Sequence, residues 1–66
     1  MDIKIISKKN EYVETWINWQ GVVPSVGDTI VVSLGDFREI PVNRPVLERI
    51  IDGKRPSMVT LIIDPD

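Results

Sequence analysis

Residues 11–20, with the sequence EYVETWINWQ, decide between two folds, because they fit both a strand and a helix. As a helix, the segment would be capped by Asn10, end at Gly21 and gather its three aromatic rings on one face. As a strand, it would direct successive side chains to opposite faces of a sheet. Residues that favour strands (Tyr, Val, Thr, Trp and Ile) dominate the segment, and we therefore predict a strand.

The strand interpretation separates the aromatic side chains of this segment. The core face would consist of Val13, Thr15, Ile17 and Trp19. Tyr12 and Trp16 would lie on the opposite, polar face. We predict that these two side chains contact a partner, because Tyr and Trp supply much of the binding energy at protein interfaces. In the alternative, Trp16 covers one end of a barrel or packs beneath the loop DGKRPS, residues 52–57.

Four more apolar stretches follow or precede this segment, and short turn sequences separate them. This spacing is typical of small all-β domains, so we expect one domain spanning residues 1–66. The pair Gly35-Asp36 fits a two-residue hairpin turn. Alternation divides the side chains of three of the stretches between two faces. One face carries Ile3 and Ile5 in residues 2–7, Ile30, Val32 and Leu34 in residues 29–34, and Val59, Leu61 and Ile63 in residues 58–63.

The remaining stretch, residues 37–51, is the least regular. Pro41 and Pro45 cannot donate a backbone hydrogen bond, which places them at an edge, a bulge or a bend. A short helical turn near residues 45–52 remains an alternative to a strand. Pro45 suits the first position of such a helix, and Gly53 follows its end.

The order of strands and turns resembles that of small SH3-like β-barrels over residues 2–63. In this order, two strands are followed by the turn sequence VGD, which leads into a third strand. A tight hairpin then leads to a bent strand, and a last hairpin leads to the final strand VTLII. The resemblance implies a five-stranded antiparallel barrel and favours an interaction module. The chain lacks the aromatic-rich acidic signature of peptide-binding SH3 domains. The resemblance therefore assigns no binding residues to this sequence.

Composition removes several classes of active site. The 66 residues include no cysteine and no histidine, which excludes disulfides, Cys/His zinc sites and nucleophiles activated by histidine. Asp64 and Asp66 alone make a poor cage for a cation. We therefore predict no catalytic residues, no metal site and no cofactor, and we expect that the protein is not an enzyme.

The net charge of the chain and its basic loop residues suggest the kind of partner. The net charge of -2 disfavours nonspecific attraction to nucleic acid or anionic membranes. The absence of a long apolar run predicts no membrane span, and we expect a cytoplasmic protein. Lys54 and Arg55 form a basic loop tip, which joins Tyr12 and Trp16 as the candidate binding surface.

The resulting hypothesis is a small module that binds another protein, as an accessory or inhibitory factor, and that can self-associate into a homodimer. The alternative function is binding of single-stranded nucleic acid. Bases would stack on Tyr12 and Trp16, and phosphates would contact a set of basic side chains. That set consists of Lys8, Lys9, Lys54 and Arg55.

Overall fold

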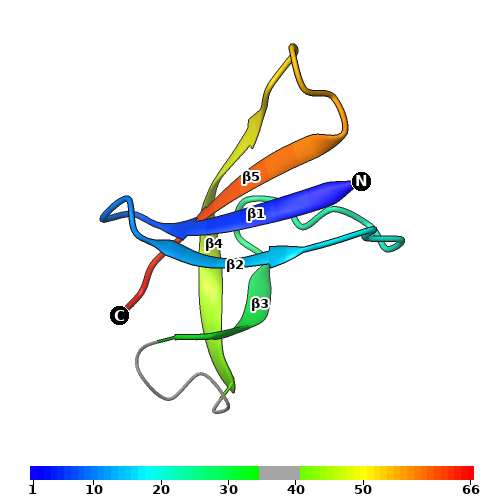
Figure 1. Cartoon of the computed structure of the whole chain (residues 1–66). Helices are drawn as coiled ribbons and strands as arrows, with labels where there is room; N and C mark the ends of the chain where they lie inside the picture. Colours follow the sequence, from blue (N-terminus) through cyan, green and yellow to red (C-terminus); the bar gives the residue numbers. More distant parts are fainter. Residues whose placement is uncertain (35–40) are drawn as a thin grey trace.

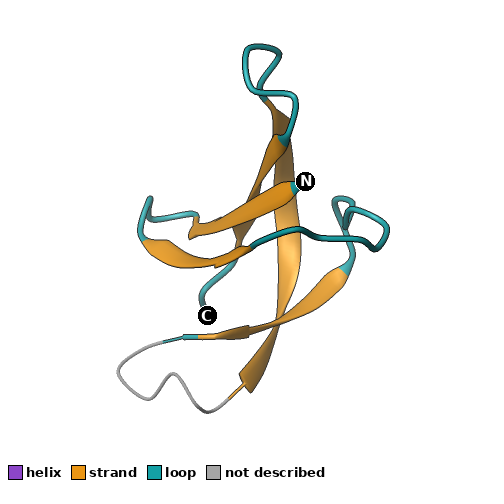
Figure 2. Cartoon of the chain, turned by 45° about the vertical axis from the view of Figure 1, so that its right-hand side comes forward, coloured by secondary structure: helices purple, strands orange, loops and turns teal. Residues whose placement is uncertain are grey.

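The computed structural model describes residues 1–34 and 41–66, and in this part the chain forms five strands and no helix (Figures 1 and 2). The strands are β1 (Asp2–Ser7), β2 (Tyr12–Trp16), β3 (Thr29–Ser33), β4 (Pro41–Ile51) and β5 (Met58–Ile63). They follow the order β2-β1-β5-β4-β3 in one curled sheet that forms a half-barrel. The expectation of a mainly β, five-stranded fold is confirmed. The predicted hairpin at Gly35-Asp36 lies outside the described residues.

The sheet is mixed, so the prediction of a purely antiparallel barrel is wrong. β1 and β5 run parallel, with Ile3 opposite Val59 and Ile5 opposite Leu61. The pairs β1–β2, β3–β4 and β4–β5 are antiparallel. Turn sequences predict only the pairing of strands that are neighbours in the chain. The central pair joins the first strand to the last, and their fully buried side chains bring these strands together.

β4 connects β3 to the strands β5, β1 and β2 of the curled sheet. Its first residues, Pro41–Pro45, pair with β3, whereas the residues from Val46 onward pair with β5. The register shifts between Val46 and Glu48, which makes Leu47 the extra residue of a β-bulge. The helical alternative for residues 45–52 is therefore wrong. A helix of about two turns is marginal by itself, whereas pairing with β5 gives residues 46–51 backbone hydrogen bonds along one edge of the strand.

The core lies on the inner, concave face of the half-barrel. Burial along β1, β3 and β5 follows the alternation of their side chains, so one of the two predicted faces of each strand supplies the core. Tryptophans 16 and 19 pack against this core from its rim. The buried apolar side chains are Ile3, Ile5, Val13, Ile30, Val32, Val46, Val59, Leu61 and Ile63.

Candidate functional site

A β-bulge in β2 changes which side chains of this strand face the core. Ile5 lies opposite Glu14 and Ile6 lies opposite Tyr12, so Val13 is the extra residue between them. Residues that are directly opposite share a face of the sheet. Glu14 therefore lies on the inner face with buried Ile5, and Tyr12 lies on the outer face with Ile6. From Glu14 to Trp16, the faces are the reverse of those predicted by simple alternation, whereas Trp19, in the loop that follows, packs against the core as predicted.

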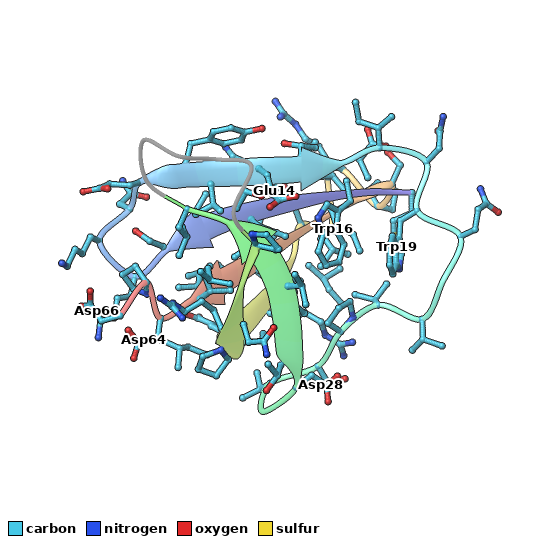
Figure 3. All side chains as sticks on the ribbon, turned by 90° about the horizontal axis from the view of Figure 1, so that it is seen from below. Glu14, Trp16, Trp19, Asp28, Asp64 and Asp66 are labelled. Atoms are coloured by element: carbon cyan, nitrogen blue, oxygen red, sulfur yellow. The ribbon has the colours of Figure 1, made fainter. Side chains whose placement is uncertain are left out.

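Trp16 consequently lies on the inner face, opposite Ile3. It is half-buried and packs against the core. Its Nε1 donates a hydrogen bond of 2.9 Å to Glu14 Oε2, and its ring centroid lies 4.7 Å from that of Trp19, with the planes tilted by 32° (Figure 3). The prediction that Trp16 lies on the polar outer face is wrong, and the alternative, in which it covers the rim of the core, describes its position.

The chain leaves the sheet immediately after Trp16. Ile17 is 72% exposed, contrary to the prediction that it belongs to the core. Asn18 takes a left-handed backbone conformation (φ 54°), which ends the extended chain. Trp19 is fixed to the N-terminus by a 2.7 Å hydrogen bond from its backbone N to the Met1 carbonyl. Its indole N–H donates to the Val22 carbonyl at 3.1 Å.

Three of the predicted binding residues are exposed, but they lie at opposite ends of the sheet. Tyr12 is 55% exposed and lies beside Ile6, near the end of β1. Lys54 and Arg55 are exposed in the turn before β5, whose first residue pairs with the start of β1. The structure therefore does not combine Tyr12, Trp16 and the basic loop tip into one surface. Their roles in binding stay predictions.

The end of the sheet that carries the N-terminus gathers exposed apolar side chains. Backbone hydrogen bonds join its loops: Trp19 N donates to Met1 O, and Asp2 N donates to Ser57 O at 2.8 Å. Figure 1 shows the loop after β2 and the loop between β4 and β5 on this side of the sheet. We call this region the N-terminal end surface. It consists of Met1, Ile17, Val22, Ile51, Lys54 and Arg55.

Ile51 is exposed for a reason that lies in the topology. It lies opposite Val59, which lies opposite Ile3, so it belongs to the inner face. β3 pairs only with the first part of β4 and does not extend to this level. Ile51 is therefore 63% exposed, and Val22, in the loop between β2 and β3, is 91% exposed. Sequence reasoning missed both residues. The position of Val22 next to the turn sequence VPSVGD was the only available signal.

At the opposite end of the sheet, basic side chains are paired with the C-terminal residues. Lys8 Nζ lies 3.2 Å from an Asp64 carboxylate oxygen, and Lys9 Nζ lies 3.8 Å from Asp66. The backbone N–H of Asp66, and then Lys8, lower the pKa of Asp64 below its usual value. The four cations of the nucleic-acid hypothesis are thus divided between two ends of the molecule, and two of them are ion-paired. Nucleic-acid binding stays a prediction.

Residues 1–34 and 41–66 contain no group of three side chains suited to hold a metal ion and no detectable pocket. Within the same part of the chain, no helix is long and apolar enough to cross a membrane. A comparison with protein families, curated proteins and solved structures found no match for the chain.

Proposed function

We propose that the protein is a small non-enzymatic binding module that contacts another protein through the N-terminal end surface. The observation that carries this proposal is the strong exposure of three aliphatic side chains, Ile17, Val22 and Ile51, which lie in the loop after β2 and at the end of β4, at the N-terminal end of one sheet. Single exposed apolar residues are common on proteins, but a group of them is typical of interaction sites. A binding role without catalysis suits an accessory or inhibitory factor.

The charges around this surface indicate the chemistry of the partner. Lys54 and Arg55 form no ion pair with any described residue. The acidic groups nearby accept local backbone hydrogen bonds: Asp52 Oδ1 from Lys54 N at 2.8 Å, and Asp2 Oδ1 from Asn18 N at 3.1 Å. The surface is therefore apolar, and its border carries the cations Lys54 and Arg55 beside the negative charges of Asp2 and Asp52. It fits a protein segment that presents apolar side chains and a carboxylate that can reach Lys54 or Arg55.

Affinity capture from the protein's own cells, followed by quantitative mass spectrometry, tests this function. The test variant is Ile17→Ser combined with Val22→Ser, and the control is Val31→Ser, which changes an exposed valine of β3. A genuine partner is retained by the wild type and the control and lost by the test variant. Binding of that partner to Lys54→Glu should be weaker, because the charge next to the apolar cluster is reversed.

Two outcomes would contradict the proposal. One is that the double serine variant, folded as judged by circular dichroism, captures the same proteins as the wild type. The other is that every captured protein is also lost by Val31→Ser, which would place the contacts on β3 instead.

A further inference from the structure

The outer face of the sheet carries a row of apolar side chains that are exposed or half-buried. In this row, Tyr12 lies opposite Ile6, Ile6 lies opposite Ile62, and Ile62 lies opposite Glu48. The row therefore crosses β2, β1 and β5 and reaches β4. We call these residues, together with Leu47 and Ile50 of β4, the outer row. Its apolar members Tyr12, Leu47 and Ile50 are exposed, and Ile6 and Ile62 are half-buried.

Tyr12 presents an apolar ring rather than a free hydroxyl to this surface. Its hydroxyl shares a 2.9 Å hydrogen bond with Thr15 Oγ1. Thr15 lies opposite exposed Lys4, so both the ring and its hydrogen-bond partner lie on the outer face. Because the polar atom of Tyr12 is satisfied within the chain, a second surface can cover the ring without leaving a buried hydroxyl unpaired.

Opposite charges lie on the two sides of the outer row. Lys4 lies one row further along β1, between Thr15 and Thr60, and Glu48 ends the row on β4. Both side chains are exposed, and neither forms an ion pair within residues 1–34 and 41–66. A partner that fits this face must therefore be apolar in its middle, with a negative group near Lys4 and a positive group near Glu48.

We propose that a second copy of the chain packs on this face and forms a symmetric dimer. A twofold axis parallel to β1 and β5, between the two sheets, places β1 of one copy over β5 of the other. Ile6 then faces Ile62 of the second copy, and Tyr12 approaches its Leu47. The same rotation brings Lys4 to the side of the second copy that carries Glu48. The outer row is thus complementary to itself in both apolar character and charge.

The size of the domain gives a reason for such an association. Nine apolar side chains are buried among the described residues, and the chain has no cysteine for a disulfide. Domains of this length bury a small fraction of their surface, and many gain stability from a partner chain. Covering the outer row would add a second apolar layer to the same sheet.

Sedimentation equilibrium over a wide concentration range tests the dimer. The charge-reversal variants Lys4→Glu and Glu48→Lys should each weaken self-association by about tenfold or more, because each places like charges together across the interface. An equimolar mixture of the two should associate again, because every contact between different copies then joins a positive to a negative group. Lys54→Glu carries the same charge change as Lys4→Glu away from the outer row, and it should leave the dimer unchanged.

The result that supports the proposal is restored association in the mixture, since loss of folding in either variant cannot produce it. A wild-type protein that stays monomeric throughout the concentration range would overturn it. A dimer that neither reversal weakens would also overturn it, because its interface would then lie elsewhere. Lys54→Glu distinguishes this dimer from the contact with another protein, since only the latter should respond to it.

Discussion

Glu14 and Ser33 join the two edges of the half-barrel: the backbone N–H of Ser33 donates a 2.9 Å hydrogen bond to Glu14 Oε1. β2 and β3 stand at opposite ends of the strand order, so this side chain bridges the opening of the sheet. Glu14 Oε2 accepts the indole N–H of Trp16. One carboxylate therefore positions both the edge of β3 and the ring that covers the rim of the core.

Replacing Glu14 should destabilise the fold. In Glu14→Ala, two partly buried N–H groups lose their acceptor, and we expect the free energy of unfolding to fall by about 1–3 kcal/mol. Glu14→Gln retains one acceptor oxygen and should lie between Ala and the wild type. Urea denaturation measures these differences. Glu11→Ala, at an exposed position, is the control, with an expected change within about 0.5 kcal/mol. Equal stability of Glu14→Ala and Glu11→Ala would show that the bridge contributes nothing.

Gly21 leaves space for the indole of Trp19. A Cβ atom at residue 21 would lie 2.9 Å from Trp19 Cζ2, closer than a van der Waals contact allows. Gly21→Ala should therefore displace the ring and lower the stability by about 1 kcal/mol. Gly53→Ala is a matched control, because a Cβ atom there meets nothing within 4 Å. Near-ultraviolet circular dichroism and urea denaturation report the two effects. A Gly21→Ala protein with the wild-type aromatic spectrum would contradict the contact.

The two tryptophan rings should couple spectroscopically. Indoles with centroids 4.7 Å apart and planes tilted by 32° are close enough for exciton interaction, which gives a paired positive and negative band in the far-ultraviolet circular dichroism spectrum. Trp16→Phe and Trp19→Phe should each remove both bands, since each leaves a single indole. Persistence of the bands in either folded variant would mean that the rings are not paired in solution.

Asp64 should make the stability depend on pH in the acidic range. The backbone N–H of Asp66 and the Lys8 ammonium stabilise the charged form, so the pKa of Asp64 in the folded protein lies below its ordinary 3.8. A lowered folded-state pKa contributes stability that is fully present above pH 3.8 and is lost as the pH falls through the folded-state value.

Titration of the Asp64 carboxyl carbon by nuclear magnetic resonance measures this pKa directly. Lys8→Gln removes one of the stabilising groups and should move the pKa of Asp64 up toward 3.8, while the hydrogen bond from Asp66 keeps it lowered. A pKa at or above 3.8 in the wild type would refute the arrangement of the C-terminal residues.

Local pattern determined most of the strands of this protein. Alternation along residues 2–7, 29–33 and 58–63 identifies strands and their inner faces, because side chains on an extended backbone alternate whatever the partner is. Strand-favouring residues likewise identify Tyr12–Trp16. Composition alone removed the thiol and imidazole chemistry, since the chain contains neither group. The exposed basic turn at Lys54 and Arg55 also follows from its sequence.

Tertiary structure decided the rest. The bulges at Val13 and Leu47 shift the alternation by one residue, and they exist only relative to the partner strands β1 and β5. Trp16 and Glu14 therefore face the core although local spacing placed them outside. The parallel pairing of β1 with β5 joins the two ends of the chain, and short β3 leaves Ile51 exposed on an inner face. The bulges, the parallel pairing and the exposure of Ile51 all depend on which strands pair and in which register. The sequence of a single segment does not specify that pairing.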